Sequence, residues 1–348
     1  MIIFRLLVSL AVLVSVAGGL MTTALASEPA TKAVVIMYHR FGETDFPSTN
    51  VTMEQFRAHV EELRTGGYHV ESLPKIVAAL RSGEKLPPKT VGLSVDDAYE
   101  SVYTRAWPIL KEAGYPLTVF VATDPVDRKL PRYMSWDQLR ELAEQGVTIG
   151  SQTKSHPHMA DHGRERVVAE LRQSNALFEE KLGNAPDLFA YPYGEANNDV
   201  MTLVKSEGFV AAFGQHSGAI GTGGELYYLP RFAMNEAFGS LDRFKLAANA
   251  LPIRVADVTP DDPTVSSPNP PLIGFTLTWP DKGLDRLNCY SSHVEKLDLQ
   301  RLGKRIEVRT ETAMPPGRTR LNCTMPAGNG RWYWFGRQFY VLKKNQTD

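Results

Sequence analysis

Residues 90–97 read Thr-Val-Gly-Leu-Ser-Val-Asp-Asp, an apolar run that ends in two adjacent carboxylates. Similar short apolar runs recur along the chain, at 33–38, 117–122, 147–151, 188–191, 210–214 and 227–230. Segments with helical periodicity separate these runs, at 52–65, 101–113, 135–145, 164–182 and 198–207. Apolar strands that alternate with amphipathic helices predict a parallel sheet or a (β/α) barrel.

The chain changes character after residue 251. Six prolines crowd the segment 252–271, which predicts a linker. Beyond it, residues 272–348 alternate apolar and polar side chains between Pro/Gly turns, a pattern typical of a small antiparallel β-sandwich. The aromatic run at 331–337, Arg-Trp-Tyr-Trp-Phe-Gly-Arg, could stack on sugar rings, but alternate aromatics in a small sandwich favour a place in its core.

The N-terminus predicts export. The first 26 residues carry one charge, Arg5, then an apolar run, and end in Ala24-Leu25-Ala26, a cleavage pattern of signal peptides. We therefore expect a signal peptide at 1–26, a barrel domain at 27–251, a periplasmic or extracellular location and no stable membrane insertion after cleavage. An uncleaved anchor is the alternative, because the apolar stretch nearly reaches the roughly 20 residues that span a bilayer.

Charge and cysteine content narrow the class of partner. Lys and Arg (38) nearly balance Asp and Glu (39) among the 348 residues, so no overall field favours nucleic acid, and a neutral or weakly charged partner is expected. Cys289 and Cys323 both lie in the last fifth of the chain, where a disulfide is the simplest account and two free thiols are the alternative. The sequence does not indicate an oligomeric state.

Three segments carry candidate chemistry. Asp96 and Asp97 follow a buried strand, at the end where (β/α) barrels build active sites, although an Asp there can also cap a helix. A cation on one carboxylate would leave the other free as a base. His156 lies in the loop after the run at 147–151 and is either a metal ligand or an ordinary loop histidine. The segment 189–195, Phe-Ala-Tyr-Pro-Tyr-Gly-Glu, reads equally as a simple turn.

Taken together and in this order, these segments resemble the motifs of the NodB-like polysaccharide deacetylases, the fourth carbohydrate esterase family, over about residues 33–251. The resemblance implies an irregular (β/α) barrel of that type, here followed by the small C-terminal β-sandwich. The family's Thr-Phe-Asp-Asp motif corresponds to residues 94–97, which implies that Asp96 is the general base and Asp97 a metal ligand. The motif His-Ser/Thr-x-x-x-His-Pro corresponds to 152–157, so His156 would be a ligand, while Gln152 stands where the family has its first histidine.

The third motif and the acid complete the implied site. Pro192-Tyr193-Gly194 matches the family's Pro-Tyr-Gly, which implies a Tyr193 backbone N–H that faces the developing oxyanion, and substrate contacts from Tyr191, Pro192 and Tyr193. The pair Tyr38-His39 is similar to one in poly-N-acetylglucosamine deacetylases, where the histidine can serve as the acid. The family's late Leu-x-x-His motif is absent from this sequence, and His216 is the second candidate for the acid.

The resemblance implies a divalent metal, with zinc expected first. A carboxamide oxygen is a poorer zinc ligand than imidazole, so Gln152 leaves Mn²⁺, Co²⁺ and Mg²⁺ open, with His158 as an awkwardly placed substitute ligand. The implied activity is a metal-dependent hydrolase that removes N-acetyl groups from an amino-sugar polysaccharide, such as poly-N-acetylglucosamine, a chitin-like polymer or the peptidoglycan glycan. The alternative is a catalytically silent, polysaccharide-binding relative.

Overall fold

A curled parallel sheet forms the larger part of the molecule. The computed structural model describes residues 31–280 and 282–342. The strand order is β10-β1-β5-β6-β7-β8-β9; β11 also pairs with β1, β4 pairs with β5, and every pairing except that of β10 is parallel. The strands are β1 (Lys32–Tyr38), β4 (His69–Val70), β5 (Thr90–Asp96), β6 (Thr118–Val121), β7 (Thr148–Ser151), β8 (Leu188–Ala190), β9 (Ala211–Phe213), β10 (Ile220–Gly221) and β11 (Phe232–Ala233). A separate short pair joins β2 (Arg40–Phe41) to β3 (Asn50–Val51).

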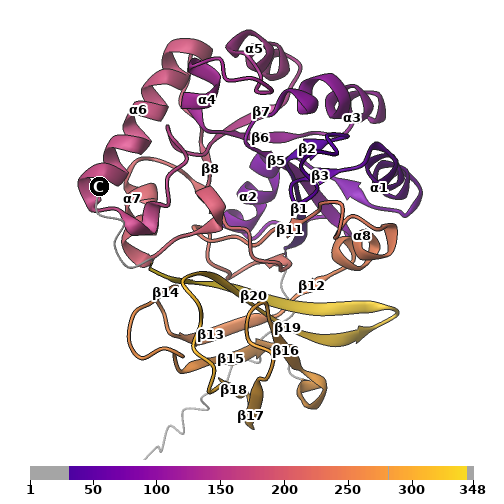
Figure 1. Cartoon of the computed structure of the whole chain (residues 1–348). Helices are drawn as coiled ribbons and strands as arrows, with labels where there is room; N and C mark the ends of the chain where they lie inside the picture. The colour runs from indigo at the N-terminus through magenta and orange to yellow at the C-terminus, as the bar shows by residue number, and fades with distance from the viewer. Residues whose placement is uncertain (1–30, 281, 343–348) are drawn as a thin grey trace, which may run out of the picture.

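Most of the helices surround this sheet on the outside, while the second helix of the chain lies in the middle of the ring of strands (Figure 1). They are α1 (Met53–Thr65), α2 (Leu73–Ser82), the π-helical turn Val102–Ala106 that runs into α3 (Trp107–Ala113), α4 (Thr123–Asp127), α5 (Trp136–Glu144), α6 (Arg164–Leu182), α7 (Asn198–Ser206) and α8 (Leu241–Ala248). Capping boxes begin α1 at Thr52 and α5 at Ser135, and left-handed glycines end α3 and α6. The predicted irregular (β/α) barrel is confirmed.

The central strands of the barrel are buried along almost their whole length because both of their faces are covered. All seven residues of β5 are buried, and so are six of the seven in β1. One apolar cluster fills the space on one side of these strands with Val34, Ile36 and Leu93, while Val35 packs on the other side against α2. Helix-covered parallel strands therefore bury continuous apolar runs and leave polar residues for their ends.

Two antiparallel sheets form the C-terminal β-sandwich, which lies beneath the barrel in Figure 1. One sheet has the order β12-β20-β19-β16, with β14 also paired to β20, and the other has the order β13-β15-β18-β17. The strands are β12 (Leu251–Pro252), β13 (Arg254–Thr259), β14 (Thr264–Val265), β15 (Ile273–Trp279), β16 (Asn288–Ser291), β17 (Asp298–Leu302), β18 (Arg305–Arg309), β19 (Gly317–Gly328) and β20 (Arg331–Val341). The predicted sandwich is confirmed.

The proline-rich segment 252–271, predicted as a linker, carries strands of both sheets. Pro252 ends β12, and the other five prolines fall between β13 and β14 or between β14 and β15, where a missing N–H breaks no ladder. The proline content alone therefore resembled that of a linker. The domain boundaries themselves stay a prediction. The predicted signal peptide at 1–26 lies outside the described residues, and none of the helices that the structure describes is long and apolar enough to cross a membrane.

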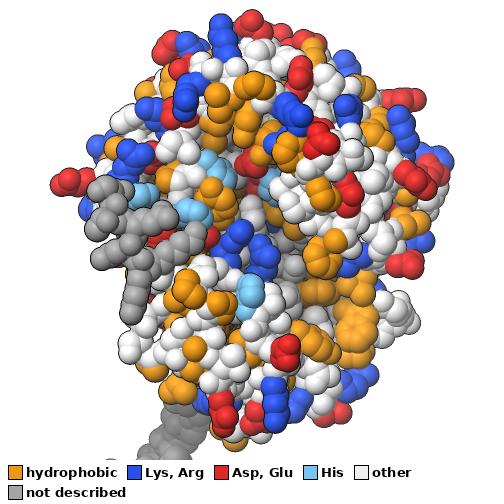
Figure 2. Space-filling model, in the orientation of Figure 1, with side chains coloured by type: hydrophobic (Ala, Val, Ile, Leu, Met, Phe, Trp, Pro, Cys, Tyr) orange, Lys and Arg blue, Asp and Glu red, His pale blue; other side chains and the backbone are white. Residues whose placement is uncertain are grey.

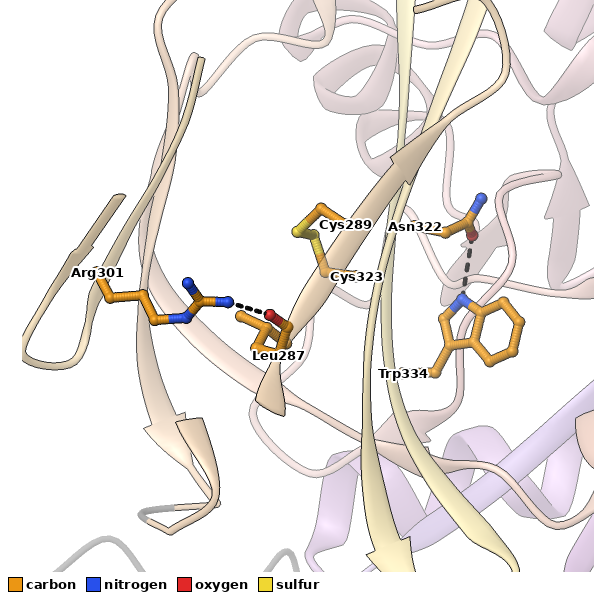
Figure 3. Close-up of a disulfide and its surroundings, with 6 residues drawn as sticks. All are labelled: Leu287, Cys289, Arg301, Asn322, Cys323 and Trp334. Atoms are coloured by element: carbon orange, nitrogen blue, oxygen red, sulfur yellow. Dashed lines mark hydrogen bonds between the residues drawn. A yellow bond between two sulfur atoms is a disulfide. The ribbon is translucent and has the colours of Figure 1, made fainter. Parts of the chain in front are cut away.

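A disulfide joins Cys289 of β16 to Cys323 of β19, as predicted (Figure 3). The two residues are direct partners across the antiparallel pair, and both are buried. The bond therefore fixes β16 to the sheet that faces the barrel.

The aromatic run on β20 packs in two directions. Tyr333 and Phe335 contact the core between the two sheets, as predicted. Trp334 instead packs edge-on against Phe232 of the barrel, with ring centroids 5.0 Å apart, and donates from Nε1 to Asn322 Oδ1 at 3.0 Å (Figure 3). At Gly336 the strand lies so close to the barrel that an added Cβ would overlap the Ser217 carbonyl oxygen. The sandwich is thus tightly docked on the barrel.

Candidate active site

Four of the predicted site residues, His39, Asp97, His156 and Tyr193, come together at a groove between the barrel and the sandwich. This groove has a volume of about 680 Å³. Strand ends supply His39 after β1, Asp97 after β5, His156 after β7, Tyr193 after β8 and Gln215 after β9, and β19 of the sandwich adds Arg318 and Arg320. Figure 2 shows histidine and Lys/Arg side chains around a hollow in the middle of this face. The carboxyl ends of neighbouring parallel strands thus assemble residues that lie far apart in the sequence.

Asp96 is held as a buried carboxylate by an arginine that the sequence analysis missed. Arg231 Nη1 lies 2.6 Å from Asp96 Oδ1, and Arg231 Nη2 lies 2.8 Å from Oδ2; neither side chain is exposed to solvent. Burial alone would raise the pKa of Asp96, but the charge and hydrogen bonds of Arg231 outweigh it and hold the pKa below its usual value. Gln215 lines the groove, and its Nε2 donates to Asp96 Oδ2 at 3.3 Å.

Asp97 has a different environment although it is the next residue. Its backbone is left-handed (φ 75°), which turns the side chain away from that of Asp96 and into the groove. Its Oδ1 is buried without a hydrogen-bond partner among the described residues and lies 3.4 Å from His156 Nε2. Burial lowers the pKa of His156, against the opposing charges of Asp97 and Asp96, and so favours the neutral imidazole that metals bind.

These observations test whether the chain fits a divalent metal. An unpartnered carboxylate oxygen beside a neutral imidazole fits two ligands of such an ion. Gln152 does not supply the third as it stands: its Oε1 accepts the Asp97 backbone N–H at 3.2 Å, and its buried Nε2 has no partner among the described residues. Within residues 31–280 and 282–342, no group of three or more His, Cys, Asp or Glu side chains could hold a metal. The fit is therefore to a site with two protein ligands.

The Pro-Tyr-Gly turn places its residues unequally. Tyr191 is fully buried and donates its hydroxyl hydrogen to the Tyr227 carbonyl at 2.8 Å, and Pro192 is buried as well, so the structure does not support the predicted substrate contacts for either. Tyr193 lines the groove with a left-handed backbone (φ 59°), a strained conformation for a tyrosine. Its carbonyl accepts from Arg318 Nη1 at 3.3 Å and from Gln338 Nε2 at 3.2 Å.

His158 is occupied within the same turn. Its Nδ1 lies 2.6 Å from Glu195 Oε2, and its ring stacks on Tyr193 with centroids 4.1 Å apart. Both interactions hold the imidazole beside the turn and against Glu195. The structure therefore does not favour His158 as a substitute metal ligand.

The two candidate acids separate in space. His39 lines the groove together with Asp97. His216 lines a different cavity, between Tyr228 and the sandwich, and burial followed by the charges of Arg337, Arg320 and Arg231 lowers its pKa to about 3. His216 therefore lies apart from Asp97 and His156, and His39 is the candidate acid that shares their groove.

Comparison with known proteins agrees with the geometry. The family model described as "Polysaccharide deacetylase" matches residues 83–212. The chain is 25% identical over 222 residues to the "Putative polysaccharide deacetylase YxkH" of Bacillus subtilis, covering 62% of this chain and 78% of that one. It is 28% identical over 248 residues to the "Poly-beta-1,6-N-acetyl-D-glucosamine N-deacetylase" of Escherichia coli, covering 58% of this chain but only 36% of that protein.

A solved structure extends the comparison. The structure of IcaB from Ammonifex degensii is similar with a TM-score of 0.55 and 25% identity, over 62% of this chain and 97% of that one. The resemblance to the NodB-like polysaccharide deacetylases is confirmed. Of these relatives, the Escherichia coli protein carries the name of an N-deacetylase, a hydrolase that acts on amide C–N bonds.

Proposed function

From a barrel whose residues 83–212 match the polysaccharide deacetylases, we propose that this protein removes N-acetyl groups from an amino-sugar polysaccharide, with poly-N-acetylglucosamine as its first candidate substrate. One observation carries the proposal: a single groove collects His39, Asp97, His156 and Tyr193 from four different strand ends. The disulfide supports an exported protein, because such bonds persist in oxidising compartments.

The proposed mechanism divides the roles among these residues. Asp96 would accept the proton of the attacking water, since its pairing with Arg231 keeps the carboxylate ionised. The Tyr193 backbone N–H would stabilise the negative charge that develops on the acetamide oxygen. His39 would protonate the leaving amine, because it is the candidate acid that lines the groove. For Asp96 to reach the water, Gln215 would have to move from its place over Oδ2.

A divalent ion, if the protein binds one, would be held by Asp97 and His156 and would polarise the acetamide carbonyl. With two protein ligands the ion would keep several waters, which suits Mg²⁺ or Mn²⁺ better than zinc. The resemblance still makes zinc the first metal to test. The metal and its identity are therefore part of the proposal.

The test is release of acetate from N-acetylglucosamine oligomers by the purified full chain, with and without a chelator and with Zn²⁺, Mn²⁺, Co²⁺ or Mg²⁺ added back. We expect turnover that the chelator abolishes and one of the metals restores. Binding of the oligomers without any acetate release under all of these conditions would refute the deacetylase and support the silent, polysaccharide-binding alternative.

A further inference from the structure

The C-terminal sandwich brings basic side chains to the proposed active-site groove. Arg318 and Arg320 lie two residues apart on β19, so both project from the face of this strand that is turned to the barrel. The residue between them, Thr319, is buried on the opposite face. Both guanidinium groups line the same groove as Asp97, His156 and Tyr193.

Arg318 is already engaged with the barrel. Its Nη1 donates to the Tyr193 carbonyl at 3.3 Å, and its Nε lies 3.5 Å from Glu195 Oε1. Glu195 is buried and also contacts His158, so its negative charge is shared between the two. Arg318 therefore braces the Tyr193 turn and is partly neutralised.

Arg320 has no such compensation. Its Nε donates to Gln338 Oε1 at 3.2 Å, directly across the strand pair, and this is its side chain's one hydrogen bond among the described residues. No carboxylate in the described part of the chain forms an ion pair with it. Burial, and then the like charge of Arg318, lower the pKa of Arg320, while the charges of Tyr228 and Glu195 oppose this shift more weakly. A half-buried cation whose terminal nitrogens lack an acceptor gains from an added anion.

The two sides of the groove thus carry opposite charges. The barrel side presents the Asp97 carboxylate, and the Asp96 charge behind it is cancelled by Arg231. The sandwich side presents Arg320 and the unused part of Arg318. A neutral polymer would leave this basic wall without a partner. A polymer with a carboxylate on the sugar next to the reacting acetamide could place each group against its complement.

We propose that Arg320, assisted by Arg318, forms a subsite for a carboxylate carried by the glycan, so that the protein prefers an acidic amino-sugar polymer to a neutral one. The inference rests on the proposed function for the position of the reacting acetamide. The C-terminal sandwich would then contribute to substrate specificity. The inference also modifies the expectation of a neutral or weakly charged partner, which came from the charge of the whole chain and not from this groove. If the subsite exists, an acidic amino-sugar polymer replaces neutral poly-N-acetylglucosamine as the first candidate substrate.

The test compares two sets of oligomers of equal length by titration calorimetry at low salt: neutral oligomers of N-acetylglucosamine, and oligomers in which N-acetylglucosamine alternates with a hexuronic acid. We expect the wild-type chain to bind the acidic set roughly 10–100-fold more tightly, the usual range for a charged hydrogen bond. Arg320→Gln should bring this ratio close to 1, and Arg320→Lys should keep part of it. Added salt should weaken binding of the acidic set more than that of the neutral set.

Arg286→Gln is the matched control, because Arg286 is exposed on the same sandwich and does not line the groove. It should leave the ratio unchanged. Equal affinity for the two sets in the wild type, or an unchanged ratio in a folded Arg320→Gln variant, would overturn the subsite. Acetate release is measured on the same samples. An acidic preference without release would refute the deacetylase and keep the subsite, and release without preference would do the reverse.

Discussion

The floor of the groove and its sandwich wall are built from different kinds of sequence. The floor consists of short motifs at successive strand ends. The buried carboxylate of Asp96, next to the groove residue Asp97, forms an ion pair with Arg231. The wall consists of β19 and β20, whose Arg318, Arg320 and Gln338 belong to no motif and reach the site because the sandwich docks there. The residues of the floor are suited to the hydrolysis itself. The residues of the wall are suited to fixing the Tyr193 turn and to selecting the glycan that binds in the groove.

The largest effect should come from the floor. Asp96→Asn removes the proposed base, and we expect acetate release to fall by roughly 10²–10⁴-fold, the usual contribution of such a group. Stability should fall as well, because Arg231 would remain buried beside a neutral amide. Turnover and urea unfolding measured on the same preparation check both parts. A fully active Asp96→Asn variant would remove Asp96 from the mechanism.

The partner of Asp96 should matter mainly through charge. Arg231→Gln leaves a buried carboxylate unpaired, which we expect to cost about 3–5 kcal/mol of unfolding free energy at neutral pH. Because Arg231 lowers the Asp96 pKa, its stabilisation is present above the ordinary aspartate pKa and is lost as pH falls through the lowered value. The variant should therefore lose activity at a higher pH than the wild type. Arg231→Lys, which keeps the charge, is the control, and pH–rate profiles with denaturant curves are the measurement.

The wall should depend on its disulfide. Replacing Cys289 and Cys323 by alanine opens a link across 34 positions, and we expect the sandwich to lose roughly 4 kcal/mol on the chain-entropy account. Native-state hydrogen exchange can separate the two regions: amides of β16 and β19 should exchange faster, while those of β5 should not change. Equal acceleration in both regions would mean that barrel and sandwich unfold as one unit.

Gln152 tests the metal side of the floor. Gln152→His should raise the affinity of the apo-protein for Zn²⁺ by roughly 10–100-fold, the range over which a poorly supported ligand changes affinity. The new imidazole would join Asp97 and His156, which lie 3.4 Å apart. Competition of zinc with a chromophoric chelator is the measurement, and it does not depend on activity. Unchanged affinity would show that position 152 does not face the ion, and His156→Gln should lower the affinity in the same assay.

The smallest effect should come from the brace between wall and floor. Gln338 Nε2 donates to the carbonyls of Tyr193 and Gly194, so Gln338→Ala removes both bonds from a strained turn. We expect at most about a 10-fold loss of turnover, roughly 1 kcal/mol for the lost hydrogen bonds, because Arg318 and Tyr228 still donate to these two carbonyls. Asn322→Ala is the control, because Asn322 lies on the same sandwich face but bonds Trp334. Equal losses in both variants would point to weakened docking instead of a misplaced turn.

The sequence by itself determined the barrel, the sandwich, the disulfide and the residues Asp97, His156, His39 and Tyr193 at one edge. The periodicity of apolar residues, the capping residues of helices and the position of a residue at the end of a strand are local properties of the chain. They can therefore be recognised in the sequence. Helix α2, which begins after Ser72 and ends at Gly83, was not among the helices named from the sequence. Proline content predicted a linker at 252–271, where the structure has β13 and β14, because proline content does not reveal which N–H groups a ladder needs.

Only the tertiary structure decided what neutralises, covers and braces these residues. Arg231 pairs with Asp96 across 135 positions, and Gln338 meets Tyr193 across 145, and no spacing rule connects such pairs. The sequence alone does not distinguish His39 from His216 as the candidate acid. In the structure they line different cavities, and His216 is buried. Charge compensation and desolvation depend on distance in space and not along the chain, so the fold must be known before either can be assigned.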